Sequence, residues 1–183
     1  IKLLGITEVI NNKLFERVHP CLVKKNNYIA NINGVMNAVI LDGMPVGQSV
    51  LQGEGAGPGP TSSALMSDLL SILRGNIKYP FGTPSVKRKK ISFFDKNLYF
   101  NSLYLRFDVK DKSGVLSSIT KIFAKNRISI KNLIQKPNKK NSKASIIIIT
   151  HENFEKNYNK LFKNLSKNKF ILKKPTFIRI EKV

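Results

Sequence analysis

Four glycines and two prolines fall within residues 53–60, which have the sequence Gly-Glu-Gly-Ala-Gly-Pro-Gly-Pro. Glycine permits positive φ and lets a ligand or another chain approach the backbone closely. Pro60, Thr61 and Ser62 are residue types found where a helix begins, and the free N–H groups of a helix start can bind an anion or a dinucleotide. The stretch therefore predicts a backbone-exposing turn that is either purely structural or faces a ligand.

This glycine turn departs from the familiar nucleotide-binding motifs. It lacks the last glycine of G-x-G-x-x-G, and no Gly-Lys-Ser/Thr follows it as in a P-loop. It also comes after an expected hairpin rather than after the first strand of a βαβ unit. The residue pattern alone therefore favours a structural strand-to-helix turn.

His19 and Cys21 could together suggest nucleophilic catalysis. A nucleophilic pair needs two converging side chains and a third group that orients the base, and the sequence supplies no such third group. A hydrogen-bonded structural histidine and a small buried cysteine are favoured. His151 has no neighbouring His or Cys, so no metal site is expected.

The first part of the chain predicts several short elements. Ile1–Gly5 suggests the last turn of a helix with Gly5 as its cap, and residues 14–19 suggest a strand that Pro20 ends. Residues 36–41 and 46–51 predict a hairpin. Beyond the glycine turn, an apolar face at helical spacing predicts a helix that ends near Arg74-Gly75.

The second part predicts a regular order of elements, βαββαβ. Strands are expected at 103–109, 128–135, 144–150 and 170–180, the last broken near Pro175, and helices follow Gly114 and begin near Phe154. A polar turn at 138–141 joins the middle two strands. This order is typical of a ferredoxin-like sandwich of two helices on a four-stranded sheet, so the fold class expected for the whole chain is α+β.

The net charge of +21 suggests nucleic acid or an anionic membrane as a partner. Only six of the 32 basic residues are Arg, however, and recognition surfaces favour Arg. No RNA-binding strand with stacking aromatics is present, and no apolar run nears the roughly 18 residues of a membrane span. A single cysteine fits a reducing compartment. We expect a cytoplasmic protein with no nucleic-acid or membrane partner.

Residues 77–101 contain Pro80, Gly82, Pro84 and the basic run at 87–90. This composition breaks periodicity and predicts a linker. A localisation signal or phosphate-binding patch is the alternative for the basic run, but a solvated linker is favoured.

The first part resembles the end of the catalytic domain of homoserine dehydrogenase. The resemblance rests on Asn37-Ala38-Val39, Gly53-x-Gly55-Ala56-Gly57, Pro60-Thr61-Ser62-Ser63-Ala64 and Asp68-Leu69. It implies that Gly55 and Gly57 lie beside NAD or NADP, which an upstream domain mainly binds. It also implies that the functional lysine and carboxylates lie upstream, so no catalytic residue is expected here. Ser62 stands where Ala is usual.

The second part resembles the ACT domain of bacterial homoserine dehydrogenases. The resemblance rests on residues 105–116, on Ile128-Ser129-Ile130 and on Gln135. It implies an effector site for an amino acid, with threonine expected as the effector; the site residues are Asp111, Ser113, Gly114, Val115 and Leu116, with Asn132 and Ile134 of a neighbouring domain. Ser113 replaces the usual proline. Sensing and pure subunit assembly both remain open.

Together the two resemblances imply a truncated α/β catalytic-domain remnant (1–76), a linker (77–101) and an ACT domain (102–183). The implied activity is the NAD(P)-dependent interconversion of L-homoserine and L-aspartate 4-semialdehyde by a homo-oligomer in threonine, methionine and isoleucine biosynthesis. On this view the chain alone is inactive. The alternative is a stand-alone amino-acid-binding or dimer-forming module without catalysis.

Overall fold

The computed structural model describes residues 1–76, 82–138 and 142–182. Five residues of the expected linker (77–81) and most of the expected turn at 138–141 lie outside the described residues. The chain divides into two compact units. Unit 1 contains Ile1–Lys24 and Ile91–Val183, and unit 2 contains Lys25–Lys90.

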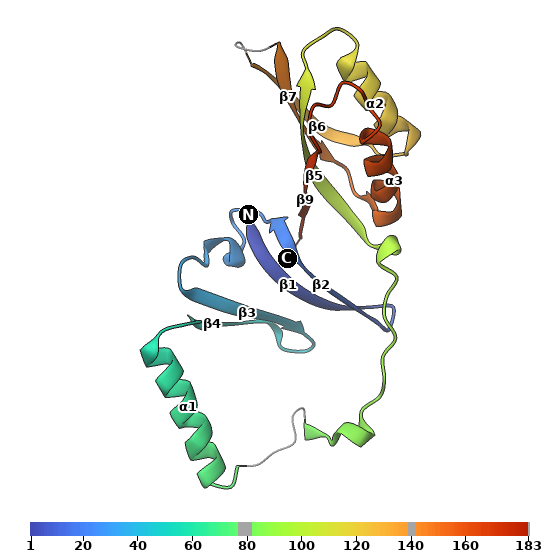
Figure 1. Cartoon of the computed structure of the whole chain (residues 1–183). Coiled ribbons are helices and arrows are strands. Elements are labelled where there is room, and N and C mark those ends of the chain that lie inside the picture. The colour runs from blue at the N-terminus through green and yellow to red at the C-terminus, as the bar shows by residue number, and fades with distance from the viewer. Residues whose placement is uncertain (77–81, 139–141, 183) are drawn as a thin grey trace. The chain divides into compact units, whose positions relative to one another are not determined.

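Most of unit 1 has the expected βαββαβ order, which confirms the α+β class. Its elements are β5 (Phe100–Lys110), α2 (Val115–Lys125), β6 (Ile130–Asn138), β7 (Lys143–Thr150), α3 (Glu155–Leu165) and β9 (Thr176–Ile180). The strand order is β9-β5-β7-β6, and a short strand β8 (Asn153–Phe154) pairs with β5. Both helices cover the same face of the sheet (Figure 1).

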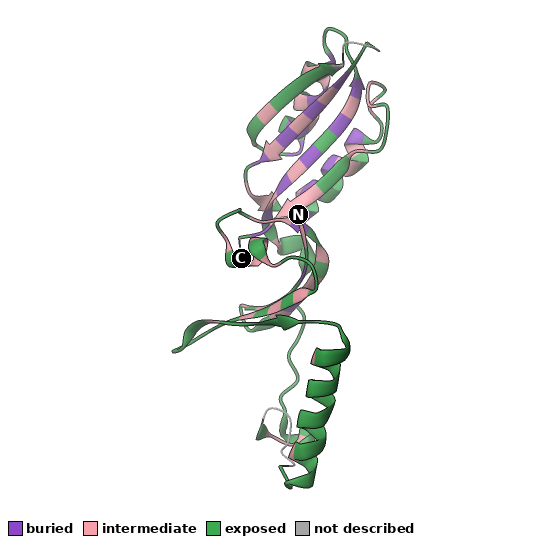
Figure 2. Cartoon of the chain, turned by 90° about the vertical axis from the view of Figure 1, so that its left-hand side faces the viewer, coloured by how far each residue is buried: buried purple, intermediate pink, exposed green. Residues whose placement is uncertain are grey.

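The hydrophobic core lies between that sheet face and the two helices. Alternate residues of β5 and β7 point inward, because side chains alternate faces along a strand, and they meet the apolar stripes of α2 and α3. The buried side chains are Leu103, Leu105, Phe107, Val109, Val115, Ile119, Phe123, Ile128, Ala144, Ile146, Ile148, Tyr158, Leu161 and Leu165. This is the best-packed part of the described chain (Figure 2).

The first 24 residues extend the same sheet. β1 (Lys2–Ile10) and β2 (Lys13–Leu22) form an antiparallel hairpin, and the end of β2 pairs in parallel with β9. The expected helix end at Ile1–Gly5 is therefore wrong. A short apolar run does not by itself distinguish helix from strand, and pairing with β2 decides in favour of strand here.

The last residues of the expected linker also belong to unit 1. Leu14 of β2 donates its N–H to the Ser92 carbonyl at 2.9 Å and accepts from the Phe94 N–H at 2.8 Å. The Phe15 ring contacts the rings of Phe94 and Tyr99. Two short 3-10 helices interrupt the irregular backbone of the linker, Ser85–Lys87 in unit 2 and Lys96–Leu98 in unit 1.

Unit 2 contains the expected hairpin and the helix that follows it. A 3-10 turn (Tyr28–Asn31) precedes β3 (Met36–Gly43) and β4 (Gly47–Glu54), and α1 runs from Pro58 to Leu73. None of the described residues of unit 2 is buried, and α1 is exposed along its length (Figure 2). No described helix is long and apolar enough to cross a membrane.

The uneven core predicts a contrast between two Leu→Ala substitutions. Leu161 of α3 is fully buried, whereas Leu65 of α1 is 66% exposed. Leu161→Ala should lower the free energy of unfolding by about 2–5 kcal/mol because it leaves a cavity, and Leu65→Ala by no more than about 0.5 kcal/mol. Urea unfolding followed by circular dichroism measures both, and equal losses would contradict the assignment of the core.

Candidate functional site

The glycine turn connects β4 to α1. The Gly55 N–H donates to the Val35 carbonyl at 2.9 Å, which holds the turn against the start of β3. Gly57 has φ of 125° and directly precedes the first residue of α1. A side chain would be strained at this φ, so glycine is required for the change of direction. The predicted strand-to-helix turn is therefore confirmed.

Gly55 is constrained by a neighbouring side chain. A Cβ atom at Gly55 would lie 1.4 Å from Asn37 Nδ2. Asn37 belongs to the Asn-Ala-Val segment on β3, and its Nδ2 donates to the Val35 carbonyl at 3.4 Å. The glycine thus makes room for the asparagine, which gives Gly55 a packing role independent of any ligand.

The start of α1 offers few hydrogen-bond donors to an anion. Pro58 and Pro60 have no N–H group, and the Thr61 N–H donates to the Gly57 carbonyl at 3.1 Å. Only Gly59 retains a free N–H in the first turn, and no atom lies within 4 Å of the position its Cβ would occupy. The turn is therefore open to close approach but is a poor cradle for a pyrophosphate.

The expected effector turn precedes α2. Gly114 has φ of 83° in the left-handed region, and its carbonyl accepts from the Ser118 N–H at 2.9 Å. The Asp111 N–H donates to the Ser142 carbonyl at 2.8 Å, and its side chain accepts from Gln135 Nε2 at 3.3 Å. Backbone hydrogen bonds thus hold both ends of the turn.

The expected effector residues do not form one pocket within the chain. Val115 is buried in the core and Leu116 packs against it. Asn132 and Ile134 lie on β6 opposite Ile149 and Ile147, on the face that the helices leave uncovered. Among the described contacts, Gln135 rather than Asn132 or Ile134 reaches the Asp111 side chain.

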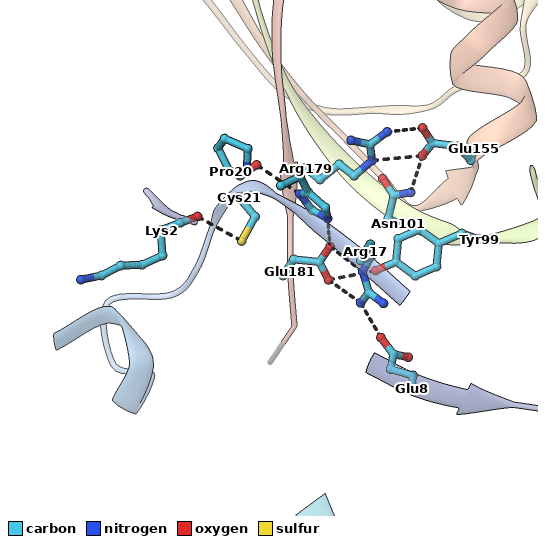
Figure 3. A network of polar contacts seen from close by, with 11 residues as sticks. Lys2, Glu8, Arg17, Pro20, Cys21, Tyr99, Asn101, Glu155, Arg179 and Glu181 are labelled. Carbon is cyan, nitrogen blue, oxygen red and sulfur yellow. Dashed lines mark hydrogen bonds and ion pairs between the residues drawn. The ribbon is translucent and has the colours of Figure 1, made fainter. Parts of the chain in front are cut away.

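A buried ion-pair network joins β2 to the end of β9, and sequence reasoning missed it. Glu181 is only 4% exposed. Its two carboxylate oxygens accept from Arg17 at 3.0 and 3.3 Å, and the Tyr99 hydroxyl donates to it at 2.9 Å (Figure 3). Arg17 also pairs with Glu8 of β1. The partners are 164 residues apart, a separation that hides the pairing from the sequence.

The network changes the acidity of its members. Burial alone would raise the pKa of Glu181, but hydrogen bonds and charge from Arg17, with Tyr99 and His19, outweigh it and lower that pKa. Burial, reinforced by the charge of Glu181, raises the pKa of the Tyr99 phenol. Glu181 is therefore held as a carboxylate and Tyr99 as a neutral donor.

A second ion pair lies further along the same strand. Arg179 of β9 pairs with Glu155, whose carboxylate also accepts from Asn101 Nδ2 at 3.0 Å (Figure 3). Among the described residues, Asn101 Oδ1 and Arg17 Nη1 are buried without a hydrogen-bond partner. These groups position strands, and nothing in their geometry resembles a catalytic site.

His19 and Cys21 do not form a catalytic pair. His19 Nε2 lies 3.2 Å from Glu181 Oε1, although the two are not aligned as a hydrogen bond. Cys21 is fully buried, its sulfur lies 3.6 Å from the Lys2 carbonyl, and burial raises the pKa of its thiol. His19 Nδ1 lies 3.2 Å from the Pro20 carbonyl oxygen, and the burial of Cys21 agrees with the expected small buried cysteine.

Comparison with known proteins assigns both parts of the chain. The family model described as homoserine dehydrogenase matches residues 1–70, and the ACT domain model matches residues 103–170. Homoserine dehydrogenase of Helicobacter pylori is 36% identical over 183 residues, covering 99% of this chain and 42% of that protein. The Neisseria gonorrhoeae enzyme is 34% identical over 189 residues. The chain is homologous to the C-terminal portion of homoserine dehydrogenases.

Solved structures agree with this assignment. A homoserine dehydrogenase from Thiobacillus denitrificans is 33% identical and superimposes with a TM-score of 0.83, covering 98% of this chain and 42% of that one. The Staphylococcus aureus enzyme at pH 7.0 has a TM-score of 0.56 at 22% identity, which supports the fold alone. The chain therefore spans less than half the length of the homoserine dehydrogenases that it matches.

The buried network predicts a stability loss in Glu181→Gln. Breaking a buried pair leaves Arg17 partly uncompensated, so the variant should lose about 3 kcal/mol of unfolding free energy at pH 7. Because the folded-state pKa of Glu181 is lowered, its contribution is present above the ordinary Glu pKa of about 4.3 and is lost as the pH falls through the folded-state pKa. The difference between variant and parent should therefore shrink in acid.

Glu152→Gln is the matched control. Glu152 pairs with Lys182 at 2.6 Å on the exposed surface, so its loss should cost less than about 1 kcal/mol. Urea unfolding at pH 7 and at successively lower pH compares the two variants. Equal losses, or a Glu181→Gln deficit that grows in acid, would contradict the proposed network.

Proposed function

We propose that the chain is the C-terminal part of an NAD(P)-dependent homoserine dehydrogenase, which interconverts L-homoserine and L-aspartate 4-semialdehyde in the synthesis of threonine, methionine and isoleucine. The observation that carries this proposal is the superposition of 98% of the chain on the Thiobacillus denitrificans enzyme. We further propose the cytoplasm as its compartment, where the NAD(P) pools are found.

The role proposed for this chain in the reaction is positional. NAD or NADP supplies the hydride chemistry, and we propose that Gly55 and Gly57 lie beside it. The open backbone at Gly59 supports close approach, while the two prolines of α1 leave too few donors to hold phosphates. The coenzyme is therefore bound mainly by the part of the protein that the chain does not include.

The proposed domain division follows homology. Residues 1–76 complete the catalytic and dimerisation domain, 77–101 form the linker, and 102–183 form the ACT domain. The exposed apolar side chains of α1, including Leu65, Leu69 and Ile72, support contact with other parts of a longer enzyme or with a second subunit. We propose a homo-oligomer that uses both domains.

One observation favours a second function, an amino-acid-binding ACT module without catalysis. Unit 1 has a complete core, whereas no described residue of unit 2 is buried. Unit 1 therefore has the packing of an independently stable domain, while unit 2 does not. An isolated chain of this kind would bind an effector or pair with a copy of itself without turning over substrate.

A chimera tests the main proposal. The 183 residues would replace the matching C-terminal portion of the Thiobacillus denitrificans enzyme, and homoserine-dependent reduction of NAD(P)⁺ would be followed by absorbance. We expect turnover from the chimera, but neither turnover nor saturable NADPH binding from the 183 residues alone, as measured by NADPH fluorescence. The reason is that the first turn of α1 offers one free N–H, on Gly59, which cannot by itself hold the coenzyme.

Two outcomes would contradict this proposal. One is a folded chimera that binds NADPH but does not oxidise homoserine. The other is saturable low-micromolar binding of NADPH by the isolated chain, which would place a coenzyme site within residues 1–183. A chimera that also carries Gly55→Ala tests the packing role of Gly55, because the added methyl group displaces Asn37.

We also propose that the turn at Asp111–Leu116, with Asn132 and Ile134 of a neighbouring ACT domain, binds threonine. A ligand carboxylate could accept from the backbone N–H groups at the start of α2, and Asp111 could accept from the ammonium group. The exposure of Ile134 on β6 leaves it accessible to a partner. Pure assembly is the alternative role of the same domain.

Calorimetry with threonine distinguishes sensing from assembly. Gly114→Leu should abolish the heat of threonine binding. However, Gly114 has φ of 83°, and a leucine is strained at this backbone angle. Gly114→Asn is the better variant, because asparagine tolerates the left-handed region while its side chain blocks the backbone. Gly34→Asn is the matched control, since Gly34 has φ of 66° and open space around it.

We expect millimolar threonine to give heat with the parent chain and with Gly34→Asn, and none with Gly114→Asn. The absence of heat from the parent at millimolar threonine, the weak end of useful affinity, would leave only the assembly role. Heat that persists in Gly114→Asn would place the threonine site elsewhere.

A further inference from the structure

A cavity of about 520 Å³ opens in unit 1 on the sheet face that the helices do not cover. Its volume is within the range of small-molecule sites. It includes no residue of the glycine turn and no residue of the effector turn. The homoserine dehydrogenase assignment gives it no role.

The strands β5 and β9 form the floor of the cavity. Tyr104 lies opposite Ile178, and Arg106 lies opposite Thr176. Leu105 and Phe107 point into the core under the helices, so their neighbours Tyr104 and Arg106 point to the other face. The sheet thus presents one aromatic and one guanidinium group side by side in the cavity.

The wall of the cavity comes from the β1–β2 hairpin. Leu22, at the end of β2, pairs with Ile180 of β9, and both Leu22 and Ile1 line the cavity. Leu22 belongs to the segment that matches homoserine dehydrogenase, and Arg106 belongs to the segment that matches the ACT domain. A ligand in this cavity would touch both segments.

The charge of the lining is positive. Arg106, Lys173 and Lys174 face a single carboxylate, Asp108. Among the described residues, no ion pair involves any of the three cations. Arg106 donates from Nε to Ser145 Oγ at 3.1 Å, which leaves its Nη groups for a ligand. A guanidinium of this kind binds a carboxylate or a phosphate through two parallel hydrogen bonds.

We propose that this cavity binds a small organic anion with one charged head. The head, a carboxylate or a phosphate, pairs with Arg106 and the two lysines. A short apolar body lies against Ile178 and Leu22. Asp108 repels a second negative group, which disfavours polyanions. The proposal does not depend on the proposed threonine site, because the two share no residue.

NMR titration of the 183-residue chain with butyrate, acetate and inorganic phosphate tests the proposal at constant ionic strength. We expect saturable shifts of the Arg106 and Thr176 amides, with dissociation constants on the order of millimolar. Butyrate should bind several-fold more tightly than acetate, because its two additional methylene groups contact the apolar wall. Tighter binding of phosphate than of butyrate would identify a phosphate head, and the reverse a carboxylate head.

Three variants separate the site from the general charge of the protein. Arg106→Gln should weaken binding about tenfold or more, and Arg106→Lys less, because it keeps the charge but loses the fork. Lys160→Gln makes the same change in net charge at an exposed position of α3, on the helix side of the sheet, and should change binding less than about twofold. If Arg106→Gln does not fold, the Lys173→Gln and Lys174→Gln double variant replaces it.

The absence of saturable shifts at tens of millimolar of all three probes, roughly the limit of specific binding, would overturn the proposal. Equal weakening of anion binding by Arg106→Gln and Lys160→Gln would also overturn the proposal, because net charge alone would then explain the effect. Failure of the threonine or chimera experiments would leave these results unchanged, and Arg106→Gln should leave the heat of threonine binding intact.

Discussion

The buried carboxylate of Glu181 is the interaction on which the arrangement of unit 1 depends. A charge removed from water must be paired and hydrogen-bonded, or it destabilises the fold. Arg17 and Tyr99 meet this requirement with three hydrogen bonds. Because Arg17 comes from β2, Tyr99 from the approach to β5 and Glu181 from the end of β9, the pairing holds three distant segments in one register.

That register makes the sheet continuous across the two homology segments. The parallel pairing of Cys21 with Arg179 and of Leu22 with Ile180 brings the homoserine dehydrogenase segment and the ACT strands into one sheet. A displacement of β9 would therefore also displace β2, because the two strands are paired. The cavity beside Arg106 lies at the same junction.

The sequence predicted what local pattern determines. The alternation in Leu103–Val109 and the apolar stripes of the helices were sufficient for the βαββαβ order, and the Gly-Pro composition of residues 53–60 was sufficient for the turn before α1. The pattern was not sufficient at Ile1–Gly5, where the pairing of Lys2 with Cys21 makes a strand of a segment predicted as helix. The helical preference of this segment was overridden by its pairing with β2, the other strand of the same hairpin.

The candidate sites were predicted less completely than the fold. Gly55 and Gly57 form the expected turn, but the constraint from Asn37 on Gly55 is visible only in three dimensions. Glu181 and Arg17 were missed because 164 residues separate them and neither belongs to a motif. The cavity was missed for the same reason, since Leu22, Arg106 and Lys174 are adjacent only after folding.

Hydrogen exchange at the Glu181 amide tests the continuous sheet most directly. This N–H donates to the Leu22 carbonyl at 2.9 Å, a bond that exists only if the end of β9 lies against β2. In the 183-residue chain, hydrogen exchange measured by NMR should show that this amide is protected together with the amides of β7. All of them should lose this protection together on unfolding. Exchange of the Glu181 amide at the rate of an unstructured chain, while β7 remains protected, would contradict the pairing of β9 with β2 and hence the continuous sheet.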